Sequence, residues 1–73
     1  MNEHEKEVCE WFKALRQENV EGLQALEGGM VMRSNDGTGW KDITQEQIDR
    51  LKSQIAELDR LIEAYERQDA QRP

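Results

Sequence analysis

The sequence predicts a small α+β domain in which a β-hairpin connects two helices, the second of them long and amphipathic. Three observations predict this class. Apolar residues recur at three- and four-residue steps in both halves of the chain, a glycine pair closes the first half, and an Asp-Gly pair typical of hairpin turns follows it. A chain of 73 residues is long enough for one domain, which we place at 1–67, with a polar, frayed tail at 68–73.

The first helix begins near the N-terminus. Asn2 and Glu5 have the spacing of a capping pair, and early glutamates suit the positive end of a helix dipole. The residues of its apolar face are Val8, Trp11, Phe12 and Leu15. We therefore expect Trp11 to pack mainly in the core.

The course of this helix beyond residue 18 has two interpretations. The apolar pattern continues through Val20, Leu23 and Leu26. Asn19 and Gly22 weaken it, so either one continuous helix or a break followed by a short second helix fits the pattern. Gly28 and Gly29 end the segment, because glycine readily adopts the left-handed conformation that closes a helix.

A hairpin is predicted next, with strands at 30–34 and 38–42 and a turn at 35–37. A two-stranded hairpin alone is only marginally stable. We therefore expect it to rest on the helices through Trp40, together with either Val31 or the pair Met30 and Met32.

Two features predict the last helix: a capping signal at its N-terminus and a stripe of apolar residues at helical spacing. Thr44 and Gln47 form a potential capping box, with Ile43 and Ile48 at the spacing of a hydrophobic staple. The apolar stripe is Ile48, Leu51, Ile55, Leu58, Ile62 and Tyr65. It fits packing against the first helix and hairpin, and also pairing with a partner helix or a second copy.

Charge excludes one class of partner. The net charge is −6, and residues 1–28 carry seven acidic and three basic side chains. No cluster of Lys and Arg is present, so direct DNA or RNA binding is not expected. A protein with a basic surface is the expected partner, and we expect a monomer or a weak dimer. The candidate partner-binding residues are Glu3, Glu7, Glu10, Trp11, Glu18 and Glu21. The acidic ones fit a docking strip, and they equally fit a solvated face.

Residues that could carry chemistry are few, and we expect no enzyme, cofactor or metal site. His4 is the only histidine, at a terminus, and Cys9 is the only cysteine. We place Cys9 toward the polar side of the first helix, away from His4, with no activating partner. The lone cysteine and the charged N-terminus favour a cytoplasmic protein, and no apolar run reaches the length of a membrane span.

Two resemblances bear on function. The order helix–hairpin–helix is similar to that of the small head-to-tail joining proteins of tailed phages. The similar features are the first helix, Met30-Val31-Met32, the Asp36-Gly37 turn, and Leu51, Ile55 and Leu58. The C-terminal segment 68–73 departs from that family, because it lacks the basic tail expected there.

In length and charge the whole chain resembles a small phage-encoded regulator of host RNA polymerase. This resemblance rests on size and acidity and not on a motif, so it carries over no functional residue. It implies binding to a polymerase subunit in the host cytoplasm, inhibition of initiation by sigma displacement, and antitermination. The acidic first helix would then be the natural contact. We rank this regulator before the joining protein, and a self-pairing coiled-coil protein third.

Overall fold

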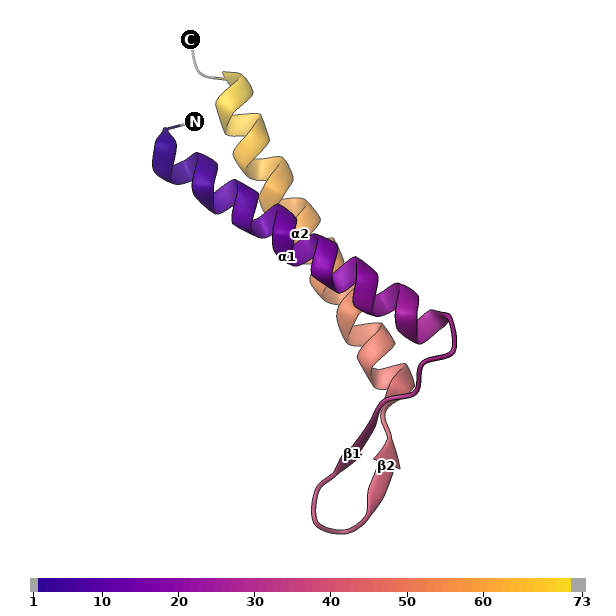
Figure 1. The fold of residues 1–73 in the computed structure, drawn as a ribbon. Helices are drawn as coiled ribbons and strands as arrows, with labels where there is room; N and C mark the ends of the chain where they lie inside the picture. The colour runs from indigo at the N-terminus through magenta and orange to yellow at the C-terminus, as the bar shows by residue number, and fades with distance from the viewer. Residues whose placement is uncertain (1, 72–73) are drawn as a thin grey trace.

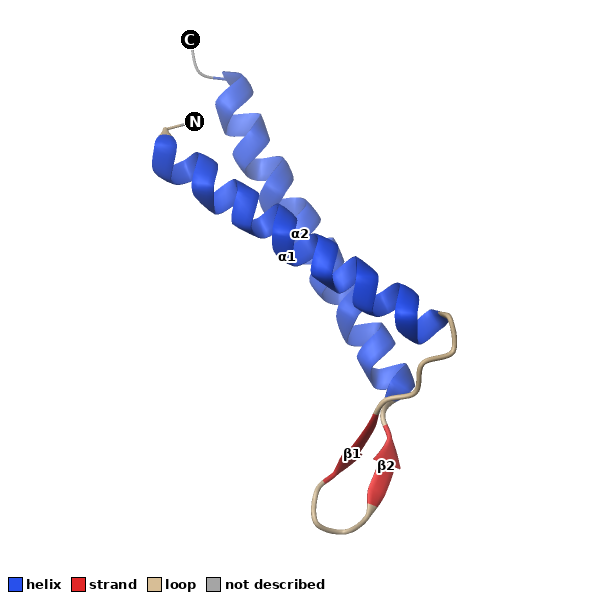
Figure 2. Ribbon diagram, viewed as in Figure 1, coloured by secondary structure: helices blue, strands red, loops and turns tan. Residues whose placement is uncertain are grey.

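The computed structural model describes residues 2–71 as two long antiparallel helices joined by a β-hairpin (Figure 1). The elements are α1 (Glu3–Glu27), β1 (Arg33–Asn35), β2 (Trp40–Asp42) and α2 (Thr44–Gln71). Figure 2 shows the two helices crossing, with the hairpin projecting beyond them. The start of α1 and the end of α2 lie at the opposite end of the molecule, where the two helices diverge (Figure 1). This is the predicted α+β arrangement of helix, hairpin and long helix.

α1 is a single continuous helix. Its N-cap is Asn2, whose side-chain oxygen accepts a hydrogen bond of 2.8 Å from the backbone N–H of Glu5, as the capping pair predicted. The helix runs through Asn19 and Gly22 without a break. A Cβ atom built at Gly22 would lie 3.6 Å from a methyl group of Leu51, so glycine here marks a point where α2 comes close.

The end of α1 is a Schellman motif centred on the predicted glycine pair. The N–H of Gly29 bonds to the carbonyl of Leu26 at 3.3 Å, and the N–H of Met30 bonds to the carbonyl of Ala25 at 3.0 Å. Gly29 has a φ of 116°, which a residue with a side chain rarely adopts. The motif reverses the chain and directs it toward the hairpin.

The helices pack together through their apolar faces, and this contact is the core of the molecule. Three side chains in the described part of the chain are buried: Cys9, Leu26 and Leu58. The Phe12 ring lies 5.8 Å from the Tyr65 ring, so α1 covers α2 well past its midpoint. The stripe of α2 therefore packs inside the chain, and a self-pairing coiled coil through that stripe would have to compete with α1.

The hairpin does not rest on the helices, and that expectation was wrong. Every residue of β1 and β2 is exposed, and Trp40 retains 73% of its accessible surface. Val31, Met30 and Met32 are exposed as well. The hairpin projects past the end of the helix pair (Figure 2), and these apolar residues remain exposed.

Local hydrogen bonds hold the hairpin instead. Asn35 pairs with Trp40, which leaves four residues in the loop and not a two-residue Asp-Gly turn. Gly37 and Gly39 supply positive φ angles of 98° and 131°. The side chain of Asp36 accepts from the N–H of Thr38 at 3.0 Å, a small turn closed by the side chain. The predicted turn therefore exists, with a longer loop.

The first turn of α2 is capped differently from the prediction. Thr44 is the first helical residue and not the N-cap, and the N–H of Gln47 bonds to the carbonyl of Ile43. The Thr44 hydroxyl instead accepts from the N–H of Met32 at 3.0 Å, while Asp42 accepts from the N–H of Thr44 at 2.9 Å. Because the Thr44 hydroxyl bonds to Met32, it does not cap the helix as predicted. These bonds fix the base of the hairpin to the start of α2.

The resulting body is long and thin. Its extents are 57 × 24 × 14 Å, and its radius of gyration is 16.5 Å, whereas a compact domain of this length has about 11 Å. α2 continues to Gln71, four residues past the predicted boundary at 67. Residues 72–73 of the predicted tail lie outside the described range. No helix in the described range 2–71 is both long and apolar enough to cross a membrane.

Candidate functional site

Five of the seven glutamates of α1 lie on the side of the helix that faces away from α2. Successive helix residues are rotated by about 100° about the axis. On that spacing Glu3, Glu10 and Glu21 nearly superimpose, opposite the face that contains the buried Cys9 and Leu26. Glu7 and Glu18 border the same strip. We call these five glutamates, all of which are exposed, the acidic face.

One lysine partly neutralises the acidic face, which the sequence had not indicated. The Nζ atom of Lys13 lies 3.8 Å from a carboxylate oxygen of Glu10 and 3.2 Å from one of Glu66 on α2. The hydrogen bond to Glu66, and then the charge of Glu10, raise the pKa of Lys13 above its ordinary value. Glu21 accepts a hydrogen bond of 3.3 Å from Gln17.

Trp11 is exposed, so its expected core role was wrong. It retains 59% of its accessible surface, with its ring 5.4 Å from that of Phe12. The spacing of Val8, Phe12 and Leu15 could have shown this, because these three half-buried residues define the apolar face and leave position 11 on its flank. Trp11 therefore borders the acidic face as a solvent-exposed aromatic side chain, a residue type enriched at binding hot spots.

Cys9 lies in the core and not toward the polar side of the helix. Its exposed fraction is 1%, the lowest of the described residues, and its thiol is free. The apolar steps could be continued through Cys9, because a free cysteine behaves as a small apolar residue. His4 is exposed. Within residues 2–71, no cluster of His, Cys, Asp and Glu has the composition to hold a metal ion.

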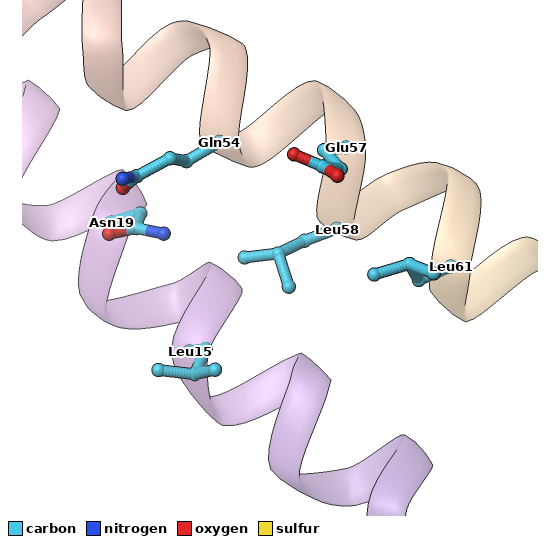
Figure 3. A pocket seen from close by; sticks show the side chains of 6 residues that line it. All are labelled: Leu15, Asn19, Gln54, Glu57, Leu58 and Leu61. Atoms are coloured by element: carbon cyan, nitrogen blue, oxygen red, sulfur yellow. The ribbon is translucent and has the colours of Figure 1, made fainter.

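A shallow groove of about 300 Å³ lies between the helices near their middle. Figure 3 shows Leu15 and Asn19 on α1 facing residues of α2 across it. The α2 residues that line it are Gln54, Glu57, Leu58 and Leu61. We call it the open groove. Sequence reasoning missed it, although Leu61, which widens the stripe of α2, was a visible signal.

The hairpin and its approach form a second exposed apolar region. Met30, Val31, Met32 and Trp40 retain 59%, 53%, 39% and 73% of their accessible surface. Apolar residues gathered in this way on a surface often mark a binding region. The sequence predicted the hairpin and expected Trp40, with either Val31 or the pair Met30 and Met32, to pack on the helices, so this exposed region is a finding of the structure.

Comparison with known protein families, with curated proteins and with solved structures finds no match to this chain.

Proposed function

We propose that this chain is a non-enzymatic, phage-encoded regulator that binds bacterial RNA polymerase through the acidic face of α1 and inhibits transcription initiation. The observation that carries the proposal is the position of the five glutamates. They are exposed along most of α1 and point away from α2, so a partner reaches them without disturbing the helix pair. The resemblance in size and acidity supports polymerase as the first partner to test.

The mechanism follows from charge and shape. The acidic face of α1, from Glu3 to Glu21, is about 27 Å long. Lys and Arg side chains on a polymerase subunit would pair with it, and such complementarity speeds encounter and selects the partner. Trp11 at the border supplies apolar contact area. Binding at a surface that sigma also uses prevents formation of the initiating enzyme. A regulator that stays bound during elongation could also act as an antiterminator.

The test is binding of purified polymerase to the immobilised chain at low and high salt. The variant reverses three charges of the acidic face, with Glu3→Lys, Glu7→Lys and Glu10→Lys. The matched control reverses three exposed charges on the outside of α2, with Glu46→Lys, Asp49→Lys and Glu63→Lys. Both variants change the net charge equally, so they separate a specific surface from overall acidity.

We expect polymerase to bind the parent chain and the α2 variant, more weakly at high salt, and not to bind the α1 variant. Equal loss in both variants would show that net charge alone governs binding. No polymerase bound at either salt would reject the proposal. A promoter-dependent transcription assay with and without sigma added in excess then tests displacement.

The exposed hairpin favours a second candidate, a head-to-tail joining protein of a phage particle. That resemblance implies the helix–hairpin–helix order, which the structure has, and assembly on neighbouring subunits would cover Val31 and Trp40. The test is co-purification of the chain with portal or tail assemblies. A joining protein is expected to lose incorporation on Val31→Asp and to leave transcription unchanged. A polymerase regulator is expected to show the reverse.

A further inference from the structure

The open groove combines apolar side chains with polar groups that can accept hydrogen bonds. Three leucines form its apolar part: Leu15, Leu58 and Leu61. The polar lining consists of the carboxylate of Glu57 and the carboxamides of Asn19 and Gln54. In Figure 3 the two carboxamides lie at one end of the groove and Leu61 at the other, with Leu58 between them.

The polar groups of the groove are not used within the described part of the chain. Asn19 and Gln54 are half-buried, yet neither carboxamide forms a hydrogen bond to a residue in the range 2–71. Glu57 forms none of the ion pairs found there, and Arg60, three residues away, does not pair with it. These three polar groups are therefore available to a ligand.

The charge of the groove favours a positively charged ligand. None of the residues that line it is a cation. The cations that connect the helices, through ion pairs with Glu66, Asp59 and Glu27, are Lys13, Arg16 and Lys52. By the helical rotation of about 100° per residue, they are displaced toward the opposite edge of the helix pair. The negative charge of Glu57 at the groove is left unpaired by them.

The size of the groove fits one side chain. Its volume of about 300 Å³ equals the lower end of the roughly 300–1,000 Å³ typical of small-molecule pockets. Gln54 and Leu61 are seven residues apart, about 10 Å along α2. A long side chain with an apolar stem and a cationic head matches this lining, because the stem covers leucine while the head stays among polar groups.

Arginine fits better than lysine. A guanidinium presents several N–H donors in a planar fork, so it can bond to a carboxylate and to carboxamide oxygens at the same time. A lysine ammonium is a compact, strongly hydrated charge that gains less from acceptors spread around it.

We propose that the open groove binds one arginine side chain of a partner protein, with its stem on the leucines and its guanidinium between Glu57 and the two carboxamides. The groove lies beside the acidic face, because Leu15 is one helical turn from both Trp11 and Glu18. The source of the arginine rests on the proposed function, whose partner has a basic surface. The ligand chemistry of the groove does not.

The first experiment titrates the full chain with blocked tripeptides and follows nuclear magnetic resonance signals of the groove. The probe is acetyl-Ala-Arg-Ala-amide. Two matched probes replace the arginine by citrulline, which keeps the shape without the charge, and by norleucine, which keeps only an apolar stem. The signals followed are the methyl groups of the three leucines and the side-chain amides of Asn19 and Gln54.

We expect the arginine peptide to shift these signals to saturation, with a dissociation constant at least about 10-fold lower than that of either matched peptide. Glu57→Gln should raise that constant about 10-fold. The matched control Glu46→Gln removes the same charge from an exposed position of α2 outside the groove, and should change it less than about 2-fold. Citrulline or norleucine binding as tightly as arginine, or an unchanged constant in Glu57→Gln, would overturn the proposal.

The second experiment measures polymerase binding with the same two variants and with Leu61→Lys, which places a lysine four residues after Glu57, at the spacing of a helix ion pair. We expect Glu57→Gln and Leu61→Lys to weaken polymerase binding at least about 10-fold, and Glu46→Gln to leave it unchanged. Polymerase that binds the groove variants like the parent, yet not the α1 variant, would overturn this inference and leave the proposed function standing. Polymerase that does not bind the parent would reject the proposed function, and the peptide titration then decides this inference alone.

Discussion

Replacing Gly22 by alanine should stabilise this protein, although the residue lies in a packed helix. Gly22 is inside α1, where glycine is about 0.8–1.0 kcal/mol less favourable than alanine. The added Cβ would lie 3.6 Å from a methyl group of Leu51, an ordinary van der Waals separation, with no backbone atom nearer. The expected gain in stability is therefore the full difference in helix propensity between glycine and alanine, plus a small van der Waals contact with α2.

We expect Gly22→Ala to raise the free energy of unfolding by about 1 kcal/mol and the melting temperature by about 4–8 °C. Urea denaturation and thermal melting, both followed by circular dichroism, measure the two quantities.

The matched control is Gly29→Ala, the same change at a φ of 116°. It should destabilise the chain by about 1–3 kcal/mol, because alanine is strained in that conformation. An unchanged or lowered stability in the Gly22 variant would refute a continuous α1 in ordinary contact with Leu51. A stabilised Gly29 variant would refute the Schellman motif.

Three further predictions concern the core, a cap and the hairpin. Leu58→Ala should cost about 2–3 kcal/mol and lower the melting temperature by about 10–20 °C, because this leucine is 8% exposed between the helices; a drop of less than about 5 °C would contradict its core role. Hydrogen bonds from Thr44 hold the pKa of Asp42 below its ordinary 3.8, so this carboxylate stabilises the fold above that pH and the contribution is lost as the pH falls through the lowered value. In acid titrations, Asp42→Asn should therefore reduce the loss of helix signal over that pH range. Parallel titration curves for the parent and the variant would contradict a stabilising hydrogen bond between Asp42 and Thr44. Trp40→Ala should leave the melting temperature within about 2 °C of the parent, since the ring is 73% exposed; a large drop would mean that the hairpin packs on the helices after all.

The sequence was sufficient for the order and type of the elements. Helical spacing identified both helices, Asn2 and the pair Gly28 and Gly29 bounded α1, and Asp36-Gly37 located the turn. These features are set by local backbone chemistry, which a single chain reveals. The position of the hairpin relative to the helices is not local. Because an isolated hairpin is only marginally stable, we expected its side chains to pack on the helices. Hydrogen bonds within the hairpin and to Thr44 support it instead.

The features of the candidate site also divide into those set by local spacing and those that depend on how the helices pack. The exposure of the five glutamates followed from their spacing on a helix, and the structure agrees. Trp11 was misplaced because it was counted with the apolar face, although the spacing of Val8, Phe12 and Leu15 leaves position 11 on the flank of that face. Cys9 was misplaced in the opposite sense, as a polar residue that turned out to be the most buried. The open groove depends on the relative position of two helices, which spacing along one chain does not give.

The thinness of the core has a consequence for how such a chain changes over time. With Cys9, Leu26 and Leu58 as the buried side chains of the described range, most positions contact water and tolerate many substitutions. Identity between descendants of one ancestor should therefore fade quickly while the shape persists. Relatives would be recognised by the positions that the backbone geometry restricts, above all the glycine at the end of α1 and the apolar residues through which the helices pack.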